Sequence, residues 1–194
     1  MKAERPKKCV MDPGERALIE RSRTGDAAAF EALVAPYDRR LLGLAYDLVG
    51  NAEDARDVYQ EALLAVYRAL PGFRMESSFS TWMHRIAINQ ALKFRRRWRR
   101  PEAGETAQEE IAEQRAGGST PEEVVLDREL RAQLESGLEQ LSPQERLAFA
   151  LCHLQGTRLK DAAVMMDCSV GSVKSYLFRA REKMRGVLGA YLDE

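Results

Sequence analysis

Apolar residues recur every third or fourth position along most of the chain, with polar residues between them. This period places apolar side chains on one face of a helix, and no segment alternates with the period of a half-buried strand. The pattern predicts an all-α fold. Helices are expected at residues 13–23, 26–49, 52–70, 78–97, 121–140, 143–154, 158–167 and 170–188. A kink is expected at Pro36, because proline lacks an amide proton for the inner turns.

Four of these helices begin with a capping sequence. In each, a side chain able to cap a helix is followed three positions later by an acidic residue, and in three of them proline takes the first helical position. The four capping residues are Asp12, Asn51, Thr120 and Ser142. These signals fix where the helices start more firmly than periodicity does.

The segment at 101–119 is acidic, contains glycine and has no aromatic residue, which predicts a flexible linker. It divides the chain into a helical domain at 1–100 and a second domain at 120–194. The second domain has four expected helices, of which the last two form a helix-turn-helix.

Charge balances over the chain, with 30 Lys and Arg against 30 Asp and Glu, but its distribution is uneven. Residues 93–100 and 158–185 are basic, whereas residues 102–129 are strongly acidic. This arrangement indicates two cationic surfaces separated by an acidic connector that does not itself lie on DNA. Ordinary solvated faces joined by a solubilising linker are the alternative.

Residues 159–185 read as two helices joined by a tight turn. Ser169 offers a cap for the second helix, and Gly171 stands where we expect two crossing helices to leave little room. Apolar stripes run along the two helices at Leu159, Ala162, Ala163 and Met166, and at Val173, Leu177, Ala180 and Met184. The other faces of the second helix carry groups for phosphates or base edges: Ser172, Lys174, Ser175, Tyr176, Phe178, Arg179 and Arg181. A solvated basic helix in an ordinary bundle would look similar.

Aromatic, cationic and hydroxyl side chains interleave between residues 73 and 98. Such a mixture suits unpaired bases, which stack on rings while guanidinium groups hold the backbone. The candidates are Arg74, Ser77, Ser78, Ser80, Thr81, Trp82, Arg85 and Asn89. Helical spacing gives Phe79 and Trp82 a competing place in the core of the bundle.

The expected helix at 52–70 has a polar stripe beside its apolar one. The stripe consists of Asp57, Gln60, Glu61 and Leu64, with Tyr67 one turn further on. It suits docking on helices of a partner protein, and a plain solvated face is an equally good reading.

Candidate chemistry is sparse. Cys9, Cys152 and Cys168 form no close pair, which fits a reducing compartment, and buried thiols are a better reading of Cys152 and Cys168 than a metal site with His153. No phosphate-binding loop or catalytic motif is present, so we expect no cofactor, no metal and no enzymatic activity. Without a signal peptide or an apolar run of membrane-spanning length, a cytoplasmic protein is expected.

Four segments in order, residues 54–61, 73–89, 141–146 and 171–181, resemble the two conserved regions of bacterial extracytoplasmic-function (ECF) sigma factors. The resemblance extends over nearly the whole chain. It implies a transcription initiation subunit that binds core RNA polymerase and promoter DNA, and commonly an anti-sigma factor.

Region by region, the resemblance assigns the 57–64 stripe to polymerase docking. It assigns the 74–81 loop and the following helix to the minus-ten element, and residues 172–181 to the minus-thirty-five element. The chain departs from the family pattern in three places. Met75 replaces a usual glycine, Lys160 and Asp161 replace an acidic pair, and Tyr176 replaces a common arginine.

Two other classes of protein remain open. A free-standing helix-turn-helix regulator would bind duplex operator DNA as a dimer without polymerase. A helical RNA-binding protein would use the arginine-rich run at 93–100.

Overall fold

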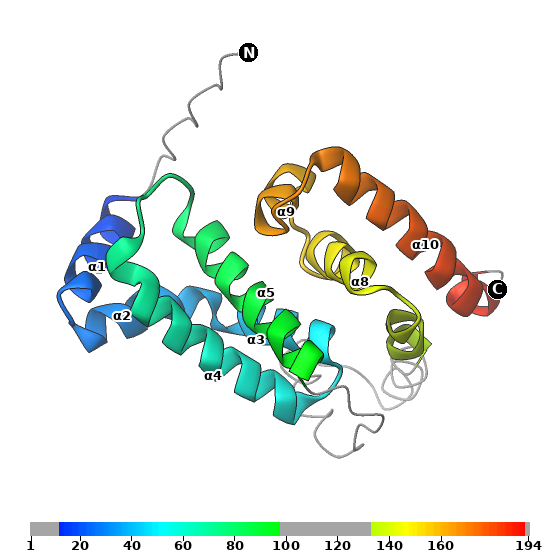
Figure 1. Ribbon diagram of the computed structural model, residues 1–194, viewed down its shortest axis with the longest axis horizontal. Helices are drawn as coiled ribbons and strands as arrows, with labels where there is room; N and C mark the ends of the chain where they lie inside the picture. The colour runs from blue at the N-terminus through cyan, green and yellow to red at the C-terminus, as the bar shows by residue number, and fades with distance from the viewer. Residues whose placement is uncertain (1–11, 98–132, 193–194) are drawn as a thin grey trace, which may run out of the picture.

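The computed structural model describes residues 12–97 and 133–192, and every regular element within these two ranges is helical. The all-α prediction is therefore confirmed. Figure 1 shows helices α1 to α5 on one side of the molecule and α8 to α10 on the other. The predicted linker at 101–119 and the first part of the predicted helix at 121–140 lie outside the described residues, while 133–139 is helical.

The amino-terminal domain consists of α1 (Pro13–Arg23), α2 (Ala27–Val34), α3 (Asp38–Val49), α4 (Ala52–Ala69) and α5 (Phe79–Arg97). The predicted kink at Pro36 is confirmed, because the 3-10 turn η1 (Ala35–Tyr37) separates α2 from α3. A second 3-10 turn, η2 (Leu70–Gly72), ends α4.

The carboxy-terminal domain contains α8 (Pro143–Phe149), η4 (Ala150–Leu154), α9 (Leu159–Met165) and α10 (Val170–Leu192). The sequence predicts one α-helix over 143–154, but its last five residues wind as a π-helix. A π turn widens the hydrogen-bonding ring, and periodicity does not reveal it.

Caps hold the helix starts as predicted. The Asp12 carboxylate accepts from the amides of Gly14 and Glu15, and the Asn51 side chain accepts from the amide of Asp54. Ser142 and Glu145 form a reciprocal capping box. Each such cap contributes about 1 kcal/mol to stability. The fourth predicted cap, Thr120, lies outside the described residues.

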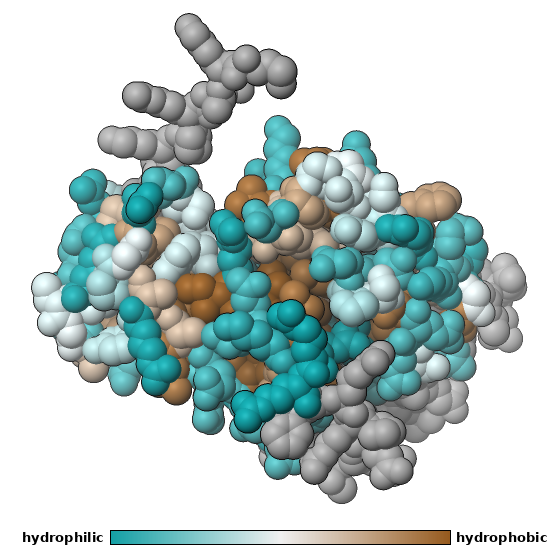
Figure 2. All heavy atoms as spheres, in the orientation of Figure 1, coloured by the Kyte–Doolittle hydropathy of each residue, from teal (hydrophilic) through white to brown (hydrophobic). Residues whose placement is uncertain are grey.

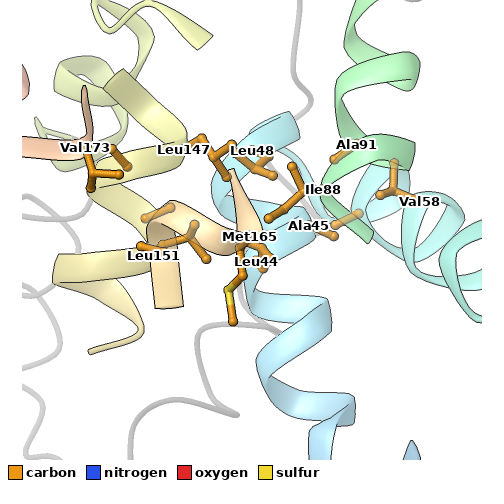
Figure 3. Packing of buried hydrophobic residues seen from close by; sticks show 14 of the residues in the cluster. Leu44, Ala45, Leu48, Val58, Ile88, Ala91, Leu147, Leu151, Met165 and Val173 are labelled. Carbon is orange, nitrogen blue, oxygen red and sulfur yellow. The ribbon is translucent and has the colours of Figure 1, made fainter. Parts of the chain in front are cut away.

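The two domains share one hydrophobic core, which the sequence did not predict. Buried residues of α3 and α5 form a continuous cluster with buried residues of α8, η4 and α9. Leu44, Leu48 and Ile88 come from the first domain, and Leu147 and Met165 reach toward them from the second (Figure 3). Figure 2 shows the apolar side chains between the polar surfaces of the two sides, over α5 and α9.

Polar contacts surround this shared core. Arg146 is buried and donates from Nε to the main-chain carbonyl of Asp47. Arg40 and Gln155 donate to each other's carbonyl oxygens over 3.2 and 2.9 Å. The Tyr46 hydroxyl donates to Glu135 over 2.6 Å. The domains therefore meet through matched polar groups as well as through apolar packing.

The amino-terminal domain has a second cluster of its own. It brings together Ile19 of α1, Leu33 of α2, Val66 of α4 and Phe79 of α5. These side chains are almost completely buried, so the cluster holds α1, α2, α4 and the start of α5 together. Within the described ranges no helix is long and apolar enough to cross a membrane.

Candidate nucleic-acid and polymerase interfaces

Helix α10 presents its predicted reading residues on the outside of the second domain. The predicted inward stripe of Val173, Leu177, Ala180 and Met184 is buried, which confirms the orientation of the helix. Of the candidates on the other faces, Lys174, Ser175, Phe178, Arg179 and Arg181 are exposed, and Ser172 and Tyr176 are half-buried. Phe178 has 67% of its surface exposed, an unusual position for a large apolar ring.

The turn before α10 is held by hydroxyl groups. Ser169 accepts from the amide of Ser172 over 3.0 Å, so its predicted capping role is confirmed. The prediction for Gly171 is wrong, because a Cβ there would meet only Ser169 Oγ, at 3.6 Å. The close approach is instead at Gly137, where an added Cβ would lie 2.7 Å from the Met184 sulfur.

Two arginines of α10 contact residues of α8 and η4. Arg179 forms an ion pair from Nε to Glu145 Oε1 at 3.4 Å, and its guanidinium lies 5.3 Å from the centre of the Tyr176 ring. Arg181 donates from Nε to His153 Nε2 over 3.1 Å. Burial, together with the charge of Arg181, lowers the pKa of His153, which favours the neutral ring that this bond requires.

Glu145 and His153 are functional candidates that the sequence did not predict. Glu145 was recognisable only as the third residue of a capping box, and His153 only as a weak metal ligand. Neither pattern tells which residues of α10 would lie opposite. A hollow of about 590 Å³ beside His153 is lined by the apolar side chains of Leu159, Leu177 and Phe178 and by the basic side chains of Lys174 and Arg181.

Three aromatic rings pack together at the loop before α5, tilted toward one another. The ring centres of Phe73 and Trp82 lie 4.7 Å apart, and those of Phe79 and Trp82 lie 5.9 Å apart. Phe79 is fully buried, which confirms the core reading for it, whereas Trp82 is only half-buried.

The other candidates of this region differ in accessibility. Arg74, Arg85 and Asn89 are exposed, whereas Ser77, Ser78 and Ser80 are half-buried. Thr81 is buried, and its hydroxyl accepts from Ser78 over 2.8 Å. Ser78 in turn accepts from the Thr81 amide over 3.1 Å, so these two residues shape the start of α5. Arg85 reaches Asp167 of the second domain at 3.7 Å.

Met75 has a backbone φ of 56°, in the left-handed region. This is the position at which the resemblance leads one to expect glycine, the residue that adopts such a conformation most readily. The Met75 side chain is half-buried against the amino-terminal core. A non-glycine residue held in this way is strained, and strain of this kind collects at functional loops.

Helix α4 carries the predicted polar stripe on an open face. Asp57, Gln60, Glu61 and Leu64 are all exposed, Leu64 to 47%. A groove of about 610 Å³ separates this stripe from α5, which lines the opposite side with Gln90, Lys93, Phe94 and Arg97. An acidic wall therefore faces a basic one, with apolar side chains between them. The spacing of residues along the chain does not predict this pairing of α4 and α5.

In the described ranges no three His, Cys, Asp or Glu side chains are grouped so as to hold a metal ion. Cys152 and Cys168 are free thiols, and burial raises the pKa of each. Cys9 lies outside the described residues.

The chain matches two protein families in order. Residues 33–100 match sigma-70 region 2, and residues 131–184 match sigma-70 region 4. The RNA polymerase sigma-H factor of Pseudomonas aeruginosa is 38% identical over 187 residues, covering 93% of this chain and 96% of that protein. The ECF RNA polymerase sigma-E factor of Escherichia coli K12 is 38% identical over 174 residues, covering 87% and 91%. The chain belongs to the ECF sigma factors.

Solved structures agree with this assignment. The sigma factor is similar to CnrH, solved in complex with the cytosolic domain of CnrY, with a TM-score of 0.67 and 25% identity over 91% of this chain and 98% of that one. It shares its fold with the sigma factor RpoE of Bartonella quintana, at a TM-score of 0.62 and 23% identity over 82% and 96%. This sigma factor thus carries region 2 on α3 to α5 and region 4 on α8 to α10.

Proposed function

We propose that three surfaces divide the work of this sigma factor. Helix α10 reads the minus-thirty-five element, the loop before α5 and the exposed side of α5 open and read the minus-ten element, and the α4 stripe docks on core polymerase. The observation that carries the proposal is the outer face of α10. Its hydroxyl, aromatic and basic side chains lie outward over a fully buried apolar stripe.

The side chains of α10 supply both kinds of contact that duplex recognition needs. Lys174 and Arg181 offer charge to phosphates, which positions the helix, while Ser175 and Arg179 offer donors to base edges. The exposed Phe178 ring suits apolar contact in the major groove. Ser172 and Tyr176 complete the candidate set.

The minus-ten surface combines a cluster of aromatic rings with cations. Trp82 offers part of a ring to an unpaired base, and Arg74 and Arg85 hold the strand around it. Asn89 offers an amide one helical turn beyond Arg85. Ser77 and Ser80 lie at the loop, whereas Ser78 and Thr81 contribute mainly by setting its shape.

The α4 stripe suits a partner with complementary charge. Asp57, Gln60 and Glu61 form a polar acidic face around Leu64, and an apolar centre with a polar rim is the common anatomy of a protein interface. We infer that the chemistry of transcription belongs to the polymerase and that this chain is not an enzyme. It acts in the cytoplasm, where polymerase and chromosome are found.

The domains must separate when the sigma factor works. In the structure they share a core, and Arg85 of the minus-ten surface is close to Asp167 of the helix-turn-helix. Two promoter elements lie far apart along a duplex that rises 3.4 Å per base pair, and touching domains do not span such a distance. Holding both domains on one polymerase raises their effective concentration at the promoter.

An anti-sigma factor is a natural further partner, because it would act on the same two domains. CnrH, which this chain resembles over 91% of its length, was solved with the cytosolic domain of CnrY bound. Because the two domains lie joined through a shared core, such a partner meets them as a single target.

Run-off transcription with core polymerase and a promoter library tests the proposal. The sigma factor is expected to direct initiation at a subset of promoters, Arg179→Ala to reduce use of the upstream element, and Glu61→Lys to weaken polymerase binding. Glu31→Lys, an exposed charge reversal on α2, is the control. Tight, specific operator binding by the isolated chain would instead favour the free-standing regulator, and co-purification with RNA but without polymerase would favour the RNA-binding protein.

A further inference from the structure

Glu145 occupies an unusual position for a carboxylate. It is the third residue of α8, and only 6% of its side chain is exposed. One oxygen, Oε2, accepts from the Ser142 amide over 2.9 Å and completes the capping box. A cap of this kind needs only an acceptor oxygen, so capping alone does not require the charge or the other oxygen.

Two basic residues of α10 converge on the same carboxylate. Lys183 donates from Nζ to Oε2 over 2.8 Å, and Arg179 places Nε 3.4 Å from Oε1. Lys183 and Arg179 lie one turn apart, on the same side of α10. Lys183 also donates to the Gln140 carbonyl over 3.3 Å. One buried acid therefore fixes the rotation of α10 against α8 at two points.

The carboxylate stays ionised in this place. Burial acts to raise the pKa of Glu145, but the Lys183 hydrogen bond and the Ser142 bonds outweigh it and hold the pKa below its usual value. The group formed by Glu145, Arg179 and Lys183 keeps one net positive charge, so it still attracts DNA.

The ion pair with Glu145 leaves the outer part of the Arg179 guanidinium available for a base edge. Arg179 engages Nε and, among the described residues, makes no hydrogen bond through the two terminal amino groups, while 55% of the side chain is exposed. The Tyr176 ring lies beside the guanidinium at 5.3 Å. Held at Nε by an acid and flanked by a ring, the guanidinium loses rotamer freedom before DNA arrives, which lowers the entropy lost on binding.

We propose that Glu145 is a positioning residue for upstream-element recognition, whose carboxylate sets the guanidinium of Arg179 for its base pair. This inference rests on the proposed reading role of α10. It assigns to the capping acid of α8 a part in promoter selectivity in addition to its part in folding.

The test uses Glu145→Gln in the full chain with core polymerase, on promoters altered one base pair at a time in the upstream element. The amide keeps an acceptor for the Ser142 cap and removes the charge. At the base pair whose preference Arg179→Ala abolishes, Glu145→Gln is expected to reduce preference about tenfold. Preferences at the other positions should change little. The double variant should show the same base preferences as Arg179→Ala alone, because both substitutions remove the same contact.

Two control variants separate positioning from folding. Ser142→Ala weakens the cap but keeps the charge, so it should lower the melting temperature and leave base preference intact. Glu182→Gln removes an exposed ion pair with Arg185 on the same helix and should change neither. If Glu145→Gln does not fold, Glu145→Asp replaces it: the side chain is one methylene shorter and withdraws the carboxylate from Arg179, so the same loss of preference at the Arg179 base pair is expected.

The outcomes are distinct. If Arg179→Ala loses a base preference while Glu145→Gln keeps it, the positioning role is refuted and the reading role of α10 stands. If neither variant alters any preference, both fail together. A uniform loss at every base pair with Glu145→Gln would show a structural role only and would also refute the proposal.

Discussion

The guanidinium of Arg146 donates to the main-chain carbonyl of Asp47, which joins the first turn of α8 to the end of α3 across 99 positions of sequence. Both residues are buried. Burial and the nearby charge of Arg95 lower the pKa of Arg146 to about 10, while Asp47 acts in the opposite direction. A charged group removed from water in this way is tolerable only while its partners stay in place.

Arg146→Ala should therefore destabilise the sigma factor by about 3 kcal/mol, because it leaves Asp47 buried without this partner and opens a cavity in the shared core. Urea denaturation measures the change. Arg68→Ala, at an exposed position of α4, is the matched control and should have almost no effect. A loss below about 1 kcal/mol for Arg146→Ala would mean that the contact does not hold the two domains together.

The shared core also predicts how the domains can be parted. Met165 of α9 is buried against the first domain, whereas its neighbour Val164 is 47% exposed. Met165→Glu would place a charge in the apolar interface, which costs more than separating the surfaces does. We expect a larger radius of gyration in small-angle scattering with unchanged helix content in circular dichroism. Val164→Glu should alter neither measurement, and an unchanged radius for Met165→Glu would contradict the expectation.

Most helices could be predicted because the signals that define them are local. The stripe of Val173, Leu177 and Ala180 needs only the helical period, and the start of α8 at Ser142 needs only a cap and a following proline. Where such a signal falls within the described residues, the boundaries were correct to within a few residues. The π turn after Phe149 has no local signal and was missed.

Pairings between distant elements could not be read from the chain. Periodicity shows that Leu48 and Leu147 face inward, but not that they face each other. The same holds for the candidate site, where the reading residues were named from exposure and chemistry while Glu145 and His153 were missed. The error at Gly171 has the same origin, since a crossing distance depends on the second helix.

Met75 allows a direct measurement of backbone strain. A non-glycine residue in the left-handed region loses about 1–2 kcal/mol. Met75→Gly and Met75→Ala both remove the side chain beyond Cβ, so the difference between their free energies of unfolding reports what a Cβ costs in this backbone conformation. We expect the glycine variant to be more stable than the alanine variant by about 1 kcal/mol in urea denaturation.

The same pair of substitutions at Arg68 supplies the control for Met75. Arg68 lies in the helical backbone of α4, where alanine should be the more stable by about 1 kcal/mol. The order of the two variants should thus reverse between the sites. If the alanine variant were the more stable one at both sites, residue 75 would be able to leave the left-handed region without a loss of stability.

The stability of the sigma factor should fall in mild acid because of His84. This histidine is buried in α5, and its Nδ1 donates to the Ser80 carbonyl over 2.7 Å. Burial lowers the pKa of His84, the Ser80 bond partly opposes this, and the charge of Arg40 adds to the lowering. Because the folded pKa lies below the unfolded one, stability is fully present above the usual histidine pKa and is lost as the pH falls toward the folded value.

Urea denaturation at a series of pH values from about 7.5 to about 5.5, the range of histidine titration, tests the role of His84. His84→Asn keeps a donor near the Ser80 carbonyl and does not titrate, so its stability should vary less with pH than that of the natural protein. His153→Asn removes the other histidine, which is more accessible and whose pKa is also lowered, and should flatten the profile less. A profile that keeps its full slope in His84→Asn would assign the acid sensitivity to the carboxylates instead.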